Sequence, residues 1–202
     1  MNIGVLASTK ATDLQAVIDA IEAKQLNVKI PVVISNKKGA YALKRARKHN
    51  IEAVFIDSKD KKREEFDKEV SKELDKYNVD LILLIGYMRI LSNWFVNKWK
   101  NKIMNIHPSL LPAFAGGMDK DVHAEVLKAG VKETGCTLHF VTEDVDAGPI
   151  IMQKKVTIDE NETVDSLKKK VQKAEQEVIV KTLKLYEQDK IKVDNGKVTI
   201  LK

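Results

Sequence analysis

The chain of 202 residues is 44% hydrophobic and 32% charged, a composition typical of a globular protein with a full core. No apolar run approaches the length that a membrane helix needs, and Met1 leads straight into a predicted strand without a basic, apolar leader. Cys136 is the only cysteine, so an internal disulfide is excluded and a reducing cytoplasm is the expected location.

The net charge is +6, but the lysines are interspersed with acidic residues in runs such as 59–68, which is typical of solvated helix faces. Only 5% of the residues are aromatic, so few side chains could stack on bases. Nucleic acid is therefore not an expected partner, and a small anionic substrate explains the charge better.

Buried strands alternate with amphipathic helices through the first half of the chain. The patterns predict strands over 3–7, 28–35, 53–56, 79–86 and 102–106, and helices starting at 12 and spanning 41–48, 61–77 and 91–99. Thr12, followed by Gln15 three residues later, has the pattern of a helix capping box.

The pattern changes after a loop at 108–117. A helix over 118–129 is followed by strands over 137–141 and 150–154, which are close enough in sequence to pair as a hairpin. A long helix over 163–188 and a small terminal hairpin over 191–200, bent at Asn195 and Gly196, complete the chain.

This order of elements predicts an α/β fold in a single domain over residues 1–202. We expect a Rossmann-like, doubly wound and mostly parallel sheet covered on both faces, with the late antiparallel hairpin at one edge. Such sheets bind ligands beyond the carboxyl ends of their strands, and His107 lies at one such end.

Asn105 and His107 lie two residues apart where Pro108 stops the fifth predicted strand, so their side chains project to the same face. An amide that holds a developing oxyanion, beside an imidazole that moves a proton, suits acyl transfer. Such a pair is also a common local hydrogen-bonding device. Asp146 lies in a loop closed by Gly148 and Pro149, where a carboxylate more often forms a turn than catalyses a reaction.

The combination of Asn105-x-His107 with Val145-Asp-x-Gly-Pro149 resembles the glycinamide ribonucleotide formyltransferase family and, more widely, the folate-dependent formyltransferases. Matching stretches follow in the same order over essentially the whole chain, at 13–16, 35–36, 86–92, 105–112, 134–140 and 171–175. The resemblance implies the formyltransferase fold and transfer of a formyl group from 10-formyltetrahydrofolate, a co-substrate, to the amine of glycinamide ribonucleotide in purine biosynthesis. It implies no metal or redox cofactor.

The resemblance also implies three catalytic residues. Asn105 would bind the formyl oxygen, and protonated His107 would stabilise the oxyanion and help to move the proton. Asp146 would orient His107 and raise its pKa, because a nearby negative charge favours imidazolium. His123 and His139 match no catalytic position of the family, and we interpret both as structural.

On the folate side, the resemblance implies a pterin site between residues 88–91 and the loop 142–146. The implied folate-binding residues are Arg63, Met88, Arg89, Ile90, Leu91, Asn105, Thr142, Glu143, Asp144, Val145 and Asp146. Arg63 is explained nearly as well as a solvated residue of a lysine-rich helix, and Ile90 and Leu91 as core residues.

On the amine side, the implied substrate-binding residues are Ala11, Thr12, Asp13, Gln172 and Glu175. The family usually has Gly-Ser-Asn at 11–13, where backbone N–H groups and a helix N-terminus bind the substrate phosphate. If position 11 requires a positive φ, the Cβ of Ala11 costs about 1 kcal/mol or more. Asp13 places a carboxylate where phosphate is expected, and Lys10 could offset it. Gln172 and Glu175 share one helix face.

The loop at 113–123 is also longer than the usual family form, and both departures lie on the amine side. A different amine acceptor is therefore an alternative, as are a formyltetrahydrofolate deformylase and a non-catalytic binding protein. A magnesium ion held by Asp13 with Asp119 or Asp121 is a further hypothesis. We prefer the simpler interpretation that these aspartates cap or flank helices, with no metal. A monomer and a homodimer are equally compatible with the sequence.

Overall fold

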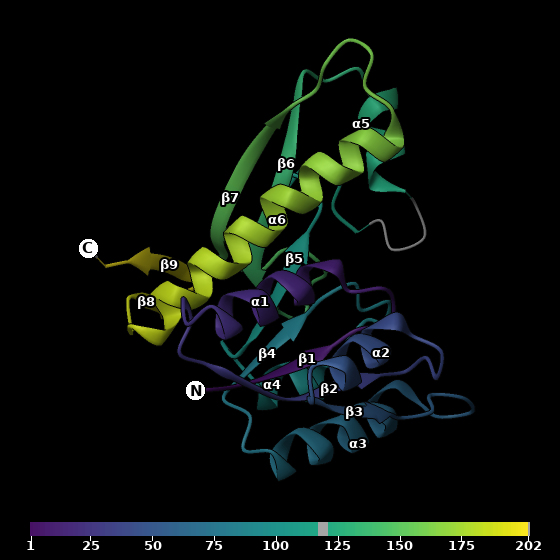
Figure 1. The fold of residues 1–202 in the computed structure, drawn as a ribbon, viewed down its shortest axis with the longest axis vertical. Helices are drawn as coiled ribbons and strands as arrows, with labels where there is room; N and C mark the ends of the chain where they lie inside the picture. The colour runs from purple at the N-terminus through teal and green to yellow at the C-terminus, as the bar shows by residue number, and fades with distance from the viewer. Residues whose placement is uncertain (117–120, 202) are drawn as a thin grey trace.

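The computed structural model describes residues 1–116 and 121–201. Its main feature is a seven-stranded sheet in the order β3-β2-β1-β4-β5-β6-β7 (Figure 1). The strands are β1 (Asn2–Leu6), β2 (Lys29–Ser35), β3 (Glu52–Phe55), β4 (Leu81–Leu84), β5 (Ile103–His107), β6 (Glu133–Phe140) and β7 (Ile150–Thr157). The first five pair in parallel, whereas β6 runs antiparallel to both β5 and β7. The predicted α/β fold with a late hairpin at one edge is confirmed.

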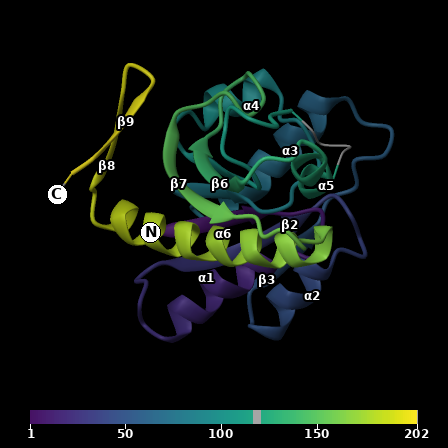
Figure 2. The ribbon, with the colours of Figure 1, turned by 90° about the horizontal axis from the view of Figure 1, so that it is seen from above.

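Helices cover both faces of this sheet. They are α1 (Thr12–Glu22), α2 (Tyr41–Lys48), α3 (Arg63–Lys76), α4 (Asn93–Lys98), α5 (Val122–Lys128) and α6 (Val164–Glu187). Helices α1, α2 and α6 lie on one side of the strands, and α3 and α4 lie on the other (Figure 2). The sheet is therefore doubly wound, as predicted.

Two apolar cores result from the alternation of side chains along the strands. Leu81 and Leu83 of β4 belong to the core beneath α1 and α6, whereas Ile82 and Leu84 belong to the core beneath α3 and α4. Because every residue of β4 is buried, this strand has the continuous apolar sequence that a doubly covered parallel strand requires.

The first helix begins differently from the prediction. Ala11, not Thr12, precedes α1, and no side chain of the described residues caps the helix, so the predicted capping box is wrong. Ala11 has a φ of 45° and a ψ of 60°, which is the left-handed conformation that the sequence raised as a possibility. Its Cβ costs roughly 1 kcal/mol or more in that conformation, and the 3% exposed side chain packs in the core.

The remaining boundaries differ from the predictions by a few residues. The β6–β7 hairpin is longer than expected, because its ladder runs from the pair Glu133 and Thr157 to the pair His139 and Ile150. Asp121 caps α5 by accepting hydrogen bonds from the N–H groups of His123 and Ala124. The predicted start of that helix at 118–120 falls outside the described residues.

The end of the chain forms the predicted terminal hairpin, which is separate from the main sheet. It consists of β8 (Ile191–Asp194) and β9 (Lys197–Ile200), which pair antiparallel. Among the helices described, none is both long enough and apolar enough to cross a membrane.

Candidate active site

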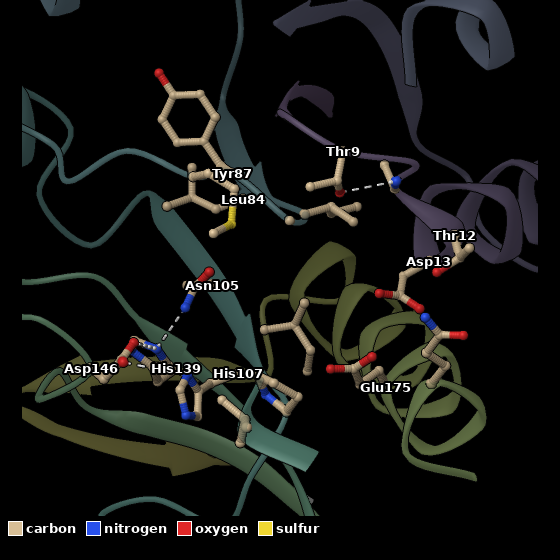
Figure 3. A pocket seen from close by; sticks show the side chains of 18 of the residues that line it. Thr9, Thr12, Asp13, Leu84, Tyr87, Asn105, His107, His139, Asp146 and Glu175 are labelled. Carbon is tan, nitrogen blue, oxygen red and sulfur yellow. Dashed lines mark hydrogen bonds and ion pairs between the residues drawn. The ribbon is translucent and has the colours of Figure 1, made fainter. Parts of the chain in front are cut away.

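A cavity of about 800 Å³ opens at the carboxyl ends of β1, β4 and β5. The residues that follow β1 and β4 line it, as do the end of β5, the loop after β6 and one face of α6. Figure 3 shows Asn105, His107, His139 and Asp146 on one side of this cavity and Asp13 and Glu175 on the other. The cavity therefore occupies the place where open parallel sheets bind their ligands.

A network of hydrogen bonds holds the loop that leaves β5 directly after His107. The buried Thr137 hydroxyl donates to the Ser109 carbonyl oxygen at 2.7 Å and accepts from the Leu111 N–H at 3.0 Å. Gln153 Nε2 donates both to the Thr137 hydroxyl at 2.8 Å and to the Leu111 carbonyl oxygen at 3.0 Å. These bonds fix the direction in which the chain leaves β5 and so help to hold His107 in place.

His107 is anchored through both ring nitrogens. Its Nε2 lies 3.1 Å from the Phe114 carbonyl oxygen, and its Nδ1 lies 3.3 Å from Asp146 Oδ2. Because a carbonyl oxygen can only accept, Nε2 carries the hydrogen of the neutral ring, and Nδ1 is the place for a second proton. Asp146 thus lies beside His107, as the family resemblance implied.

Asp146 raises the pKa of His107, as expected, but the net pKa of the ring is lowered. Burial of the ring is the largest cause, and it outweighs the Asp146 carboxylate and the Phe114 carbonyl, which both raise the pKa. Since the side chain is only 8% exposed, the imidazolium loses most of its hydration. The resting ring is therefore neutral at neutral pH.

Asp146 has a left-handed backbone, with a φ of 55°, which aspartate tolerates better than most residues. Burial would raise its pKa, but the hydrogen bond from the Gly116 N–H and the neighbouring rings of His139 and His107 hold the pKa below its usual value. A Cβ at Gly148 would lie 1.8 Å from the Phe140 carbonyl oxygen, so only glycine allows the loop to close against β6 here. The loop thereby presents an ionised carboxylate to the cavity.

His139 belongs to this group of side chains, although the sequence suggested only a structural role. Its Nε2 lies 3.2 Å from Asn105 Nδ2 and 3.6 Å from Asp146 Oδ1 (Figure 3). Its Nδ1 donates to the Phe140 carbonyl oxygen at 2.9 Å, so Nε2 of the neutral ring is an acceptor. Asn105 then directs one amide hydrogen at His139 and keeps the other for a ligand.

The register of β5 against β6 brings His139 into the site, since Asn105 and His139 are direct cross-strand partners. The sequence contains one signal for the position of His139: the polar residues Thr137 and His139 alternate with the apolar Leu138 in β6. It points both side chains to one face, but it does not identify β5 as the neighbouring strand.

The predicted folate side forms one part of the cavity wall. Met88, Arg89, Ile90, Leu91, Thr142, Glu143 and Val145 line it, whereas Arg63 and Asp144 do not. Met88, Ile90 and Val145 are 41–44% exposed, an unusual exposure for large apolar side chains around one cavity. This side therefore offers an apolar surface to a flat ring. Arg63 lies at the start of α3. Burial raises the pKa of Asp67, and the positive charge of Arg63 offsets part of that rise.

The predicted amine side forms the opposite part of the wall, with Ala11, Thr12, Asp13, Gln172 and Glu175. Asp13 and Glu175 are each only 6% exposed. Burial raises the pKa of Asp13 to about 6 and that of Glu175 to about 8, and the negative charge of Asp13 adds to the shift of Glu175. Cationic and imidazole groups also line this part, namely Lys10, Lys168, Lys169 and His123.

Over residues 1–116 and 121–201, no three His, Cys, Asp or Glu side chains are arranged to hold a metal ion. Asp121 is engaged as the cap of α5, which is the simpler interpretation of that residue. Asp119 lies outside the described residues.

The chain belongs to the formyl transferase family, because residues 1–183 match the model of the family described as formyl transferase. The phosphoribosylglycinamide formyltransferase of Escherichia coli strain K12 is 39% identical over 180 residues, which cover 87% of this chain and 82% of that protein.

A longer relative is also similar. The trifunctional purine biosynthetic protein adenosine-3 of Chironomus tentans is 46% identical over 186 residues, or 91% of this chain but only 13% of that protein. Among solved structures, the glycinamide ribonucleotide transformylase 1 of Symbiobacterium toebii superposes with a TM-score of 0.95 at 37% identity, covering 100% of this chain and 94% of that one.

Proposed function

We propose that this chain transfers the formyl group of 10-formyltetrahydrofolate to the amine of glycinamide ribonucleotide, as a step of purine biosynthesis. The observation that carries the proposal is the position of Asn105, His107 and Asp146 between an apolar wall and a wall that contains a helix N-terminus. The relatives named phosphoribosylglycinamide formyltransferase support the same substrates. A reducing cytoplasm suits the single, buried Cys136.

The reaction would begin when the acceptor amine attacks the formyl carbon. A carbon–nitrogen bond forms, and the electron pair of the carbonyl bond moves onto its oxygen. The free Nδ2 hydrogen of Asn105 would donate to this oxyanion, while His139 holds the amide in place at 3.2 Å.

His107 would move the proton. Its neutral ring accepts the proton of the attacking amine at Nδ1, and Asp146, 3.3 Å away, stabilises the imidazolium that results. When the carbonyl bond re-forms, the bond from carbon to N10 of the folate breaks and Nδ1 returns the proton to N10. Tetrahydrofolate and the formylated amine are then the products, and no charge remains on the protein.

The test is turnover of the purified protein with 10-formyltetrahydrofolate, with and without glycinamide ribonucleotide. We expect release of tetrahydrofolate that requires the ribonucleotide. Asn105→Ala should lower kcat by about 100-fold, because one oxyanion contact is worth on the order of 3 kcal/mol. Asp146→Asn, made separately in the unchanged protein, should remove most of the activity.

Other outcomes would contradict the proposal. Turnover without any amine would identify a deformylase. Folate binding without turnover, with or without the ribonucleotide, would point to a different acceptor. Asn27→Ala is a suitable control, since Asn27 is an exposed amide before β2 and does not line the cavity.

A further inference from the structure

Asp13 places a carboxylate at a helix N-terminus, where an anionic ligand would otherwise bind. No side chain of the described residues caps α1, a helix of 11 residues. Asp13 is the acidic residue in the first turn of this helix. The position that attracts anions is therefore partly occupied by the protein's own negative charge.

This carboxyl group is buried but incompletely paired. Asp13 is 6% exposed, and its Oδ1 has no hydrogen-bond partner among the described residues. The residue lines the cavity and its carboxyl group points into it (Figure 3). A buried acceptor without a donor is costly, and either a proton or a proton-bearing ligand would satisfy it.

Charged groups face Asp13 from each neighbouring element. On α6, Glu175 repels it and Gln176 donates a hydrogen bond to it, while Arg45 of α2 attracts it. The remaining titratable groups nearby are Cys136 of β6, Lys168 of α6, Lys10 of the preceding loop and His123 of α5. With the pKa of Asp13 at about 6 and that of Glu175 at about 8, the two carboxyls hold about one proton at neutral pH.

We propose that Asp13 makes the acceptor site selective for an oxyanion that carries a proton, so that one hydrogen is shared between the Asp13 carboxyl and the bound phosphate. Two ionised oxygens would repel each other here, whereas a hydrogen between them forms a charge-assisted bond. The inference rests on the proposed function, which supplies a phosphate monoester as the ligand.

Phosphate and sulfate distinguish this arrangement from an ordinary anion site. Inorganic phosphate still carries a proton at pH 7.5, as HPO4²⁻, because its last proton leaves only in strongly alkaline solution, whereas sulfate is SO4²⁻ at both pH values and has none to share. Sulfate should therefore bind only after Asp13 itself has taken up a proton. An asparagine at this position would donate an N–H at every pH and would not discriminate.

The experiment is calorimetric titration of the full chain with inorganic phosphate and with sulfate at pH 5.5 and pH 7.5. At pH 7.5 we expect phosphate to bind at least about tenfold more tightly than sulfate. This pH lies more than one unit above the Asp13 pKa of about 6, so less than roughly a tenth of the carboxyl is protonated and able to accept sulfate. Sulfate affinity should rise about tenfold or more at pH 5.5. In Asp13→Asn the two anions should bind within about twofold of each other at both pH values.

Asp19→Asn is the matched control, because Asp19 lies on the same helix but is exposed, and it should behave like the unchanged protein. Equal affinity of the unchanged protein for both anions, or selectivity that persists in Asp13→Asn, would overturn the proposal. Loss of selectivity in Glu175→Gln but not in Asp13→Asn would also overturn it, because the proton would then belong to Glu175. Anion binding needs no turnover, so failure here is distinct from a missing response to glycinamide ribonucleotide.

Discussion

Asn105 and His139 face each other across the β5–β6 ladder, with the Asn105 Nδ2 atom 3.2 Å from the His139 Nε2 atom. The imidazole thereby determines which end of the amide is directed into the cavity. Since the Nδ1 atom of His139 is committed to the Phe140 carbonyl oxygen, the ring cannot rotate without losing a second hydrogen bond. His139 is thus a positioning residue for Asn105.

His139→Leu should lower kcat by about tenfold or more with little change in the KM for either substrate, because the oxyanion donor loses its orientation. A double-mutant cycle with Asn105→Ala separates this role from simple packing. If His139 acts through Asn105, the double variant should be no slower than Asn105→Ala alone. Additive losses would contradict the role. His49→Leu, at a site outside the cavity, serves as the control.

Asp146→Asn should lower the pKa of His107 further. Burial already holds that pKa below 6.5, and Asp146 is the main group that raises it. In the unchanged protein the ring is neutral above its lowered pKa and becomes protonated as the pH falls through it. In Asp146→Asn, that transition should move to lower pH, because the charge that favours the imidazolium is lost.

Nuclear magnetic resonance titration of the His107 ring would measure this shift. Asp144→Asn alters a carboxylate two residues away that does not line the cavity, so it should leave the His107 transition in place. A transition that moves to higher pH in Asp146→Asn would contradict the electrostatic role.

Asp13→Asn should stabilise the fold at alkaline pH. Because burial raises the pKa of Asp13 in the folded state to about 6 from 3.8, the folded state holds a proton that the unfolded chain has already lost. The corresponding stability is present below pH 3.8 and is lost as the pH rises through about 6.

The advantage of the variant in the free energy of unfolding should therefore grow between pH 4 and pH 8, to on the order of 1–3 kcal/mol. Urea denaturation at both pH values measures it, with Asp19→Asn as the exposed control. A constant difference across this range would contradict the raised pKa.

Thr137→Val should lower the free energy of unfolding by about 1–3 kcal/mol, because the buried Leu111 N–H and the Ser109 carbonyl oxygen lose their partner. Since these bonds hold the loop after β5, kcat should fall as well. Thr157→Val, an exposed threonine at the end of β7, should change the stability by less than about 0.5 kcal/mol.

The fold was predictable because its signals are local. The continuous apolar run of β4 and the helical spacing of α6 each decide an element without reference to the rest of the chain. Asn105 and His107 could be placed on one face for the same reason. The start of α1 could not be predicted in this way. The left-handed backbone of Ala11 depends on packing against the core and not on the conformational preference of alanine.

His139 and the direction of the His107 pKa required the structure. The pairing of β5 with β6 joins residues 105 and 139 by a long-range register that sequence periodicity does not encode. The pKa of His107 depends on a balance between burial and one carboxylate, and only the degree of burial, which is a property of the folded state, decides which prevails.

The two apolar cores give the two substrate sides separate foundations. The predicted folate side rests on the core that contains Leu91 and Phe95, whereas the predicted amine side rests on the core that contains Leu14 and Val171. A packing defect in one core should therefore loosen one substrate's wall and leave the other rigid, because the sheet lies between them. Evolution could in this way remodel the choice of acceptor without disturbing the recognition of the one-carbon donor.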